Sequence, residues 1–272
     1  MTDSITFIGG GNMATAIIAG LAGKGAAGEH IEVVDPSDDA HGRLAGRFGV
    51  TLRRDLAHAH LGHTVILAVK PQQVPEIARQ LARRLGERLV VSIAAGIRVA
   101  DLERWLGGHQ RIVRTMPNTP AMVGAGITAL YAPPAVSAAE RSRAEAILRA
   151  VGAAVWVPEE SQLDAVTAVS GSGPAYVFYF MEALEAAAIA QGLAPEVARQ
   201  LALQTFVGAA RLALESGEEP ATLRSRVTSK GGTTERGVAA LENGGVRDAL
   251  AYAVEAAQRR SRELGDELGA LP

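Results

Sequence analysis

Short apolar runs alternate with stretches of helical periodicity along the first part of the chain. The first run, residues 5–8, is followed by a helical pattern over residues 12–24. Continuous apolar runs of this length that end at Gly or Pro are typical of strands buried on both faces of a parallel sheet. Runs of the same kind predict further strands over residues 31–35, 64–69, 89–94, 111–116, 127–131 and 153–157. Helical patterns separate most of these strands, for example over residues 74–85 and 137–151, so we predict a mostly parallel sheet with helices on both faces.

The pattern changes after about Pro158. From residue 163 onward there is no convincing strand, and the sequence consists of Ala- and Leu-rich helical stretches, several with Pro near the start and Gly past the end. The predicted helices cover residues 174–191, 195–216, 220–228, 233–242 and 246–264. We therefore predict an α/β fold in two domains. Residues 1–160 form a Rossmann-like, doubly wound dinucleotide-binding domain, and residues 161–272 form an all-α substrate and dimerisation domain.

One predicted helix is apolar on every face. Residues 176–181 read Tyr-Val-Phe-Tyr-Phe-Met, with no polar stripe for solvent. Such a helix needs either a large core or a partner chain. A helical domain of about 110 residues offers only a limited core, so we expect it to form the interface of a homodimer.

The composition is that of a globular protein and excludes several functions. Of the 272 residues 48% are hydrophobic, enough for a sizeable core, and a formal net charge of −2 without basic runs argues against a nucleic-acid partner. The absence of Cys excludes disulfides, thiolate catalysis and Cys-ligated metals. His58, His60 and His63 share one stretch without a nearby carboxylate pair. We interpret them as surface residues and predict no metal site.

The sequence has neither a secretory signal pattern nor a membrane-spanning segment. The apolar run at residues 5–8 is too short for the core of a signal peptide, and Gly, Arg or Glu interrupts every longer candidate. We expect a soluble, cytoplasmic protein that contacts no membrane.

A glycine-rich loop follows the first predicted strand. Residues 9–14 read Gly-Gly-Gly-Asn-Met-Ala and fit the pattern G-x-G-x-x-[GA]. Gly9 allows the tight turn, Gly11 lets a pyrophosphate approach the backbone, and the small Ala14 lets the helix pack against the strand. The position after a strand and before a helix favours dinucleotide binding over a turn that merely packs.

Asp35 closes the second predicted strand, where the adenosine ribose is usually bound. A carboxylate there accepts hydrogen bonds from the ribose hydroxyls and repels a 2′-phosphate, which favours NAD. Ser37 and the nearby Arg43 are able to serve a 2′-phosphate if Asp35 turns away, and Asp35 is equally able to cap the turn at Pro36. The cofactor prediction is therefore NADP or NAD.

Three further strand ends carry unusual loops. Residues 68–71 read Ala-Val-Lys-Pro, residues 92–96 are small, and residues 115–120 contain two prolines that hold Asn118 and Thr119 in place. Ligands of open parallel sheets bind outside the carboxyl ends of the strands, so these loops are candidates for the cofactor site. An ordinary solvated Lys70 and purely structural turns are the alternatives.

The helical domain contains two polar loops. Residues 170–176 read Ser-Gly-Ser-Gly-Pro-Ala-Tyr, and Ser172 there is placed to be the N-cap of the apolar helix. Residues 228–234 read Thr-Ser-Lys-Gly-Gly-Thr-Thr, two glycines flanked by hydroxyls at a helix start, which suits a carboxylate. A capped interhelical turn with Thr233 as N-cap is the alternative for the second loop.

Taken together, these strings resemble the pyrroline-5-carboxylate reductase family. The matching strings are GGGNMA at Gly9, AVKP at Ala68, SIAAG at Ser92, MPNTPA at Met116, SGSGPAY at Ser170 and SKGGTT at Ser229. They occur in the family's order over nearly the whole chain, and the last is the most specific because ordinary Rossmann enzymes lack it. One departure is Lys230, where the family commonly has proline, and it leaves the glycines and threonines of the loop intact.

The resemblance implies the roles of individual residues. Thr234 is expected to be catalytic through a hydrogen bond to the ring nitrogen of the substrate. The substrate-binding residues are expected to be Ser172, Ser229, Gly232, Thr233 and Thr234. The cofactor-binding residues are expected to be Gly9, Gly10, Gly11, Asn12, Met13, Asp35, Ser37, Ala68, Val69, Lys70, Pro71, Ala94, Ala95 and Asn118.

The resemblance also implies the reaction. Hydride from NAD(P)H adds to C5 of the cyclic imine L-1-pyrroline-5-carboxylate and gives L-proline, the last step of proline biosynthesis. A protonated imine is electrophilic at C5, so the protein mainly orients the partners and stabilises or donates one proton. Family members form homodimers, often assembled into decamers, with both chains contributing to each active site.

Two other functions compete with this assignment. A β-hydroxyacid-type dehydrogenase has the same domain order but requires a lysine in a helix as general acid or base. Here the helical half contains only Lys230, in a Gly-rich turn. A non-catalytic dinucleotide-sensing protein is the second alternative, which polar loops on both domains disfavour because they suggest a second ligand.

Overall fold

The computed structural model describes residues 4–272, and the chain divides into two compact units. The first unit contains the chain up to Ser172 together with Ala256–Pro272, and the second contains Gly173–Glu255. The long last helix, α11 (Val246–Gly269), therefore contributes to both units. None of the described helices is both long and apolar enough to cross a membrane.

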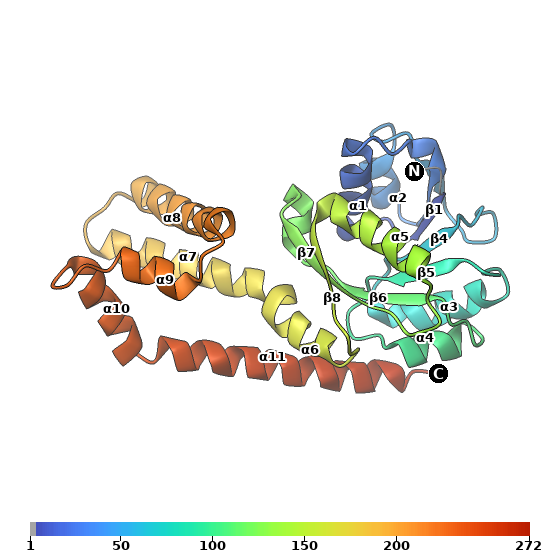
Figure 1. Ribbon diagram of the computed structural model, residues 1–272. Helices are drawn as coiled ribbons and strands as arrows, with labels where there is room; N and C mark the ends of the chain where they lie inside the picture. Colours follow the sequence, from blue (N-terminus) through green and yellow to red (C-terminus); the bar gives the residue numbers. More distant parts are fainter. Residues whose placement is uncertain (1–3) are drawn as a thin grey trace. The chain divides into compact units, whose positions relative to one another are not determined.

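The first unit is built on one sheet of eight strands (Figure 1). In spatial order β3-β2-β1-β4-β5-β6-β7-β8, neighbouring strands are parallel except β6 and β7, which are antiparallel. The order runs outward in opposite directions from β1, which confirms the doubly wound fold and puts the topological switch point between β1 and β4. The strands are β1 (Ile5–Ile8), β2 (Ile31–Val34), β3 (Thr51–Arg53), β4 (Thr64–Leu67), β5 (Leu89–Ser92), β6 (Ile112–Met116), β7 (Gly126–Tyr131) and β8 (Gly152–Trp156).

Helices cover both faces of this sheet. On one face α1 (Asn12–Gly23) and α5 (Ala138–Leu148) pack their buried side chains against the strands, and on the other face α3 (Val74–Ala82) and α4 (Val99–Trp105) do so. Every residue of the central strands β1, β2, β4 and β5 is buried, which explains why three of the four residues in each strand are apolar. The remaining helical segments are α2 (Asp38–Leu44), α6 (Gln162–Val166), the 3₁₀ turns η1 (Gly28–His30), η2 (Pro71–Gln73), η3 (Thr119–Val123) and η4 (Arg149–Val151), and the π-helical turn η5 (Thr167–Gly171).

The structure confirms the seven strands and the long helices expected from the sequence. It adds β3 and α2, which the hydrophobic pattern did not reveal. The strand β3 has only three residues, each partly exposed at the edge of the sheet, so it has no continuous apolar run. Helix α2 buries only Ala40 and Leu44, too few positions for a helical period to be visible.

The C-terminal part of α11 is anchored on the first unit. Leu268 joins the core on the α3 and α4 face. The guanidinium of Arg98 lies 2.7 Å from a carboxylate oxygen of Asp266, and Arg104 donates to the carbonyl of Gly269 at 2.7 Å. The last turns of the chain therefore belong to the Rossmann unit.

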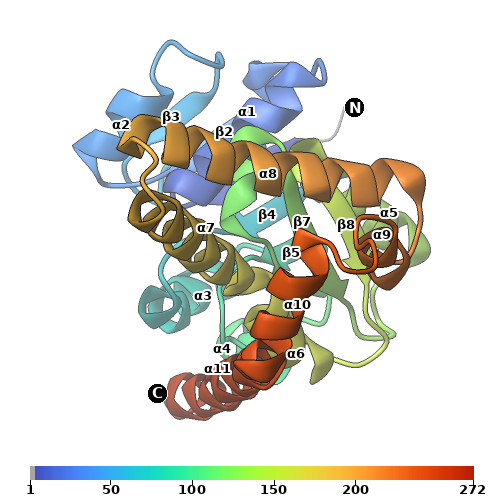
Figure 2. The same cartoon turned by 90° about the vertical axis from the view of Figure 1, so that its left-hand side faces the viewer.

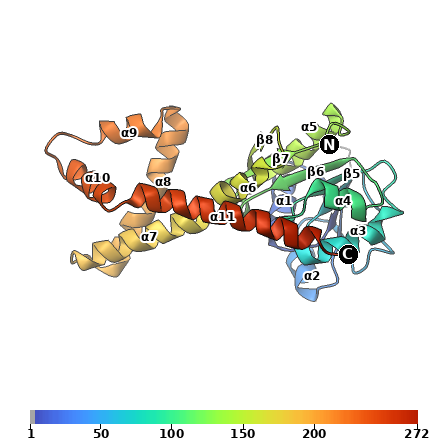
Figure 3. The same cartoon turned by 90° about the horizontal axis from the view of Figure 1, so that it is seen from below.

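The second unit consists of helices only, as predicted. Its helices are α7 (Gly173–Ala190), α8 (Pro195–Ser216), α9 (Pro220–Arg226), α10 (Thr233–Asn243) and the start of α11. Helices α7 and α8 cross and pack against each other (Figure 2), and a loop of residues 227–232 joins α9 to α10 (Figure 3).

The helices of the second unit bury very little in a single chain. Among the described residues of the five helices, only Ala198 and Ala202 of α8 are buried within this unit. Phe178 is 62% exposed and Leu214 is 84% exposed. Apolar helices with so little cover are typical of an interface between subunits.

The expected N-cap at Ser172 is wrong. Ser172 has helical backbone angles (φ −84°, ψ −25°), and its N–H donates to the carbonyl of Thr167 at 2.8 Å. An N-cap residue would have extended angles. Ser172 instead follows the π-helical turn η5 as its C-cap residue and directly precedes α7.

Candidate active site

A cavity of about 560 Å³ opens at the carboxyl ends of β1, β2, β3 and β4. It includes the switch point between β1 and β4, and doubly wound folds bind their ligands at this position, outside the carboxyl ends of the strands. Seven of the predicted cofactor-binding residues line it, namely Gly9, Gly11, Asp35, Ser37, Ala68, Val69 and Lys70.

The glycine loop at the floor of this cavity has the shape that a pyrophosphate requires. Gly9 has a φ of +103°, and a Cβ there would lie 2.6 Å from the carbonyl oxygen of Ala68, so no other residue fits. A Cβ on Gly11 would meet nothing within 4 Å, which leaves open space directly above the start of α1. The free N–H groups at this helix start favour an anion, and the loop therefore fits a dinucleotide.

Asp35 is held in place by two backbone groups. One carboxylate oxygen accepts a hydrogen bond from the N–H of Gly10 at 2.7 Å, and the other accepts from the N–H of Ser37 at 2.8 Å. The side chain thus caps the turn at Pro36, which was one of the two roles that the sequence suggested for Asp35. It also lines the cavity. Each oxygen keeps a second lone pair, so the carboxylate is still able to accept from a ribose hydroxyl.

The cationic residue near the ribose end differs from the one suggested by the sequence. The guanidinium of Arg43 donates to the carbonyl of Gly10 at 3.2 Å, and Arg43 is not among the described residues that line the cavity. Arg54 and Asp55, just past β3, line it instead. Sequence reasoning missed them because it missed the short strand whose carboxyl end carries them. The polar Arg-Arg-Asp sequence after Thr51-Leu52 was the available signal.

The other predicted cofactor residues are not among the described residues that line the cavity. Asn118 uses its side chain structurally, because its amide donates to the carbonyl of Ser170 at 3.1 Å and accepts from the N–H of Ile127 at 2.9 Å. Ala94 is buried and Ala95 exposed just beyond β5. The remaining four are Gly10 in the loop, Asn12 and Met13 in the first turn of α1, and Pro71 at the start of η2.

The predicted substrate loop lies between α9 and α10 in the second unit. Gly231 has a φ of +74°, and the N–H of Gly232 donates to the carbonyl of Ser229 at 3.0 Å. A Cβ on Gly232 would lie 2.6 Å from the hydroxyl oxygen of Ser229 and would displace that side chain, so the positive φ requires glycine at 231 and the small residue at 232 leaves room for Ser229. The N-cap of α10 is Gly232, so the alternative that named Thr233 as N-cap is wrong, because Thr233 is already the first helical residue.

This loop presents groups that suit a small carboxylate. Thr233 and Thr234 are exposed in the first turn of α10, and no described side-chain hydrogen bond engages their hydroxyls or that of Ser229. The N–H groups of a helix start have no partner within the helix, and they create a positive potential that favours an anion. Glu235 occupies only one nearby donor, accepting from the N–H of Gly231 at 2.8 Å.

The predicted residues thus fall into two groups on separate units. The cofactor residues gather on the first unit, and Ser229, Gly232, Thr233 and Thr234 gather in one loop of the second. Ser172, the fifth predicted substrate residue, is the last residue of the first unit before α7, and no described side-chain hydrogen bond engages its hydroxyl.

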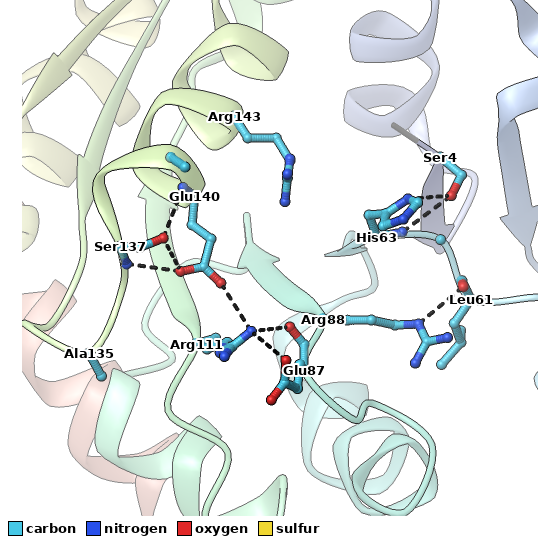
Figure 4. A pocket seen from close by; sticks show the side chains of 12 residues that line it. Ser4, Leu61, His63, Glu87, Arg88, Arg111, Ala135, Ser137, Glu140 and Arg143 are labelled. Atoms are coloured by element: carbon cyan, nitrogen blue, oxygen red, sulfur yellow. Dashed lines mark hydrogen bonds and ion pairs between the residues drawn. The ribbon is translucent and has the colours of Figure 1, made fainter. Parts of the chain in front are cut away.

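A second cavity, of about 660 Å³, lies at the amino ends of the strands (Figure 4). Its lining residues precede strands: His63 precedes β4, Arg88 precedes β5 and Arg111 precedes β6. Arg111 lies 3.6 Å from a carboxylate oxygen of Glu87 and 3.8 Å from one of Glu140. Because its acids and bases pair with one another at the amino ends of the strands, this hollow lacks the features of the dinucleotide site.

No group of three or more His, Asp or Glu side chains between residues 4 and 272 is arranged to hold a metal ion. The chain has no Cys.

Two family models match the chain. The model for pyrroline-5-carboxylate reductase dimerisation matches residues 160–264. The model described as NADP oxidoreductase coenzyme F420-dependent matches residues 4–96, the part that carries the glycine loop.

Known proteins with similar sequences match over nearly the whole chain. The pyrroline-5-carboxylate reductase of Pseudomonas aeruginosa is 46% identical over 98% of this chain and 99% of its own length. That of Synechocystis is 45% identical over 97% of this chain and 99% of its own length.

Solved structures give the same result. A pyrroline-5-carboxylate reductase from Coxiella burnetii superposes with a TM-score of 0.93 at 44% identity, covering 97% of this chain and 99% of the other. The Plasmodium falciparum enzyme, solved with NADP bound, superposes with a TM-score of 0.85 at 28% identity, covering 97% and 98%. A prephenate dehydrogenase from Aquifex aeolicus, 17% identical with a TM-score of 0.55 over 84% of this chain and 96% of its own, shares the fold alone.

Proposed function

The chain belongs to the pyrroline-5-carboxylate reductase family, and from this membership we propose which of its residues carry out the reaction. It is an NAD(P)H-dependent oxidoreductase that reduces 1-pyrroline-5-carboxylate to proline, the last step of proline biosynthesis. Its dimerisation region makes it a homo-oligomer. The dehydrogenase and sensor alternatives are set aside.

The cofactor residues are those gathered around the cavity of the first unit. Gly9, Gly10, Gly11, Asn12 and Met13 hold the pyrophosphate through backbone N–H groups at the start of α1, which the open space above Gly11 supports. The adenosine part lies toward Asp35 and Ser37, and the nicotinamide part lies toward the loops after β4 and β5, at Ala68, Val69, Lys70, Pro71, Ala94 and Ala95. Asn118 contributes by holding the loop after β6, because its amide is already bonded.

The substrate carboxylate binds at the start of α10. The N–H groups of Thr233 and Thr234 and the hydroxyl of Ser229 donate to it, and the positive end of the helix favours its charge. The observation that carries this assignment is the exposed loop with three hydroxyls that no described side-chain hydrogen bond engages. Gly232 keeps the backbone close enough for contact, and Ser172 supplies a further hydroxyl.

The chemical task of the protein is to orient the imine and manage one proton. When bound, the reduced nicotinamide supplies the hydride that C5 of the imine accepts. The hydroxyl of Thr234 hydrogen-bonds the ring nitrogen and fixes the face of the ring that C5 presents. A neutral hydroxyl is suited to orientation and to stabilising the developing amine, and the proton itself comes from solvent or from the already protonated substrate.

The two domains of the chain have separate roles. Residues 1–160 form the dinucleotide-binding domain and residues 161–272 the substrate and dimerisation domain, a boundary that the start of the dimerisation match at residue 160 supports. The homo-oligomer is a dimer, which assembles further into a decamer. The protein works in the cytoplasm.

The test is reduction of L-1-pyrroline-5-carboxylate followed by nicotinamide absorbance, with NADPH and NADH in parallel. In Thr234→Ala we expect kcat to fall about tenfold to a hundredfold, the cost of losing one hydrogen bond to a developing charge. Thr234→Ser keeps the hydroxyl and should retain most of the activity. The site assignment is wrong if the Ala and Ser variants have the same kcat, and the function is wrong if folded wild type binds cofactor but produces no proline.

A further inference from the structure

An ion pair stands at the edge of the cofactor cavity where β2 and β3 end. Arg54 reaches back with one guanidinium nitrogen 2.5 Å from a carboxylate oxygen of Asp38, and another donates to the carbonyl of Pro36 at 3.3 Å. Arg54 lines the cavity. Asp38 is not among the described lining residues, so it binds the guanidinium from a position outside the cavity. Both side chains are largely exposed, at 60% and 85%, so the pair is free to open.

Arg54 is the cation placed at the adenosine end of this cavity. The other cation that lines the described cavity is Lys70, which follows β4. In the strand order β3-β2-β1-β4 the ends of β3 and β4 are three strand spacings apart, about 14 Å. Lys70 is therefore at the opposite end of a bound dinucleotide.

The other charged side chains that line the adenosine end of the described cavity are negative and held in place. Asp35 is fixed by the N–H groups of Gly10 and Ser37. Asp55 accepts from the backbone N–H of His58 at 3.0 Å and lies 2.7 Å from its imidazole. A ribose with free hydroxyls suits these acceptors, but a 2′-phosphate carries a charge of nearly −2 and needs a cation beside it.

Resting on the proposed dinucleotide site, we propose that the Asp38–Arg54 ion pair sets how strongly this enzyme discriminates between NADPH and NADH. Arg54 is the group that receives a 2′-phosphate, and Asp38 competes with that phosphate for the same guanidinium. NADH has no 2′-phosphate, so its binding does not depend on the pair. The strength of one surface ion pair thereby adjusts the cofactor preference.

The test measures binding rather than turnover. Calorimetry with NADPH and NADH, and with the fragments adenosine 2′,5′-bisphosphate and 5′-AMP, separates the effect of the 2′-phosphate from all other contacts. In Arg54→Ala we expect the Kd of NADPH and of the bisphosphate to rise about tenfold or more, since a charge-assisted bond is lost. The Kd values of NADH and 5′-AMP should stay within about twofold of wild type, because both present a neutral 2′-hydroxyl where NADPH has its 2′-phosphate.

In Asp38→Asn we expect the Kd of NADPH to fall about twofold to fivefold, the worth of one exposed ion pair. This gain should vanish in the double variant Asp38→Asn/Arg54→Ala, because no guanidinium is then left to release. Asp39→Asn removes a neighbouring acid of the same helix that makes no described ion pair, and Arg83→Ala removes an exposed arginine away from the cavity. Both controls should leave the ratio of the NADPH and NADH Kd values unchanged.

Two results would overturn the proposal, and a third would count against the site itself. If Arg54→Ala weakens NADPH and NADH equally, or neither, then Arg54 does not read the 2′-phosphate. If Asp39→Asn matches Asp38→Asn, then net charge rather than the ion pair is responsible. If wild type binds none of the four probes while its thermal unfolding is cooperative, then the proposed cofactor site fails together with this inference.

Discussion

At the scale of single residues, the two outer glycines of the phosphate loop are required for different reasons. Gly9 is required by the fold, since its φ of +103° is unfavourable for other residues and a Cβ would overlap the backbone of Ala68. Gly11 has an ordinary φ of −68° and open space around it, so the fold does not require it. Only an approaching ligand would be obstructed by a side chain at Gly11.

This difference predicts opposite behaviour of two similar variants. Gly9→Ala should lower the free energy of unfolding by about 1–3 kcal/mol, the cost of strained backbone and overlap. Gly11→Ala should stay within about 1 kcal/mol of wild type, because a slightly weaker N-cap offsets the reduced entropy of the unfolded chain. Its affinity for NADPH should nevertheless fall at least tenfold.

Urea unfolding and calorimetry on the same preparations check this prediction. The control is Gly23→Ala at the end of α1, where a Cβ meets nothing within 4 Å and no ligand approaches. Equal loss of stability in Gly9→Ala and Gly11→Ala would contradict the assignment of Gly11 to the pyrophosphate.

At the scale of an element, helix α5 shows how one helix start is stabilised. Ser137 is its N-cap, and its hydroxyl oxygen accepts from the N–H of Glu140 at 3.3 Å. The Glu140 carboxylate in turn accepts from the N–H of Ser137 at 2.9 Å and from its hydroxyl at 2.6 Å. This reciprocal capping box fixes the start of a helix that buries Ile147 and Leu148 against the sheet.

The pKa of Glu140 lies below its ordinary value of 4.5 as a result. Burial, the largest single influence, raises the pKa of this carboxyl. The hydrogen bonds from Ser137 and the charges of Arg111 and Arg143 together outweigh burial and lower it. A depressed pKa in the folded state means that the ionised form stabilises the fold. This stabilisation is present above about pH 4.5 and is lost as the pH falls through the folded-state pKa.

We therefore predict that Ser137→Ala costs about 1 kcal/mol of unfolding free energy at pH 7, as loss of an N-cap does. The cost should shrink as the pH falls below about 4, because protonated Glu140 no longer benefits from the Ser137 donors. Urea unfolding between pH 3 and pH 7 measures both. A pH-independent difference between the variant and wild type would show that the cap acts without the carboxylate.

At the scale of the whole molecule, the helical unit is incomplete as a single chain. Its helices expose large apolar side chains such as Tyr179, Leu214 and Tyr252, which a dimerisation region is expected to cover with a partner. The first unit, by contrast, has a buried core on both faces of its sheet. We therefore expect the stability of the second unit to depend on oligomerisation.

A site shared between two chains can be tested by mixing defective subunits. Gly11→Ala impairs the cofactor loop of one chain, and Thr234→Ala impairs the substrate loop of the other. If each site combines one chain's first unit with its partner's helices, every hybrid dimer contains one fully wild-type site. Purified hybrids then have about half of the wild-type activity, and the unseparated random mixture has about a quarter.

The measurement uses the two variants co-expressed with different tags, purified as hybrids and compared with each variant alone. Hybrids no more active than the separately purified variants would mean that both units of one chain build each site. Mixing either variant with wild type is the control for subunit exchange.

The sequence by itself determined the strands other than β3, the long helices and the glycine loop. Each of these is encoded within one short segment: apolar runs for buried strands such as β1, the helical period for α1, and Gly-x-Gly for the loop. The gathering of Gly9, Asp35 and Lys70 at one sheet edge was also predictable, because parallel strands end on the same side.

Only the tertiary structure decided which groups meet across these segments. It placed Arg54 rather than Arg43 in the cavity, because the edge strand β3 carries Arg54 there while Arg43 bonds the loop carbonyl of Gly10. It committed the amide of Asn118 to Ser170 and Ile127. It also gave Ser172 helical backbone angles instead of the extended angles of an N-cap. The local sequence pattern depends on the backbone preference and hydrophobicity of each residue. The contacts of a side chain depend in addition on segments that are far away in the sequence.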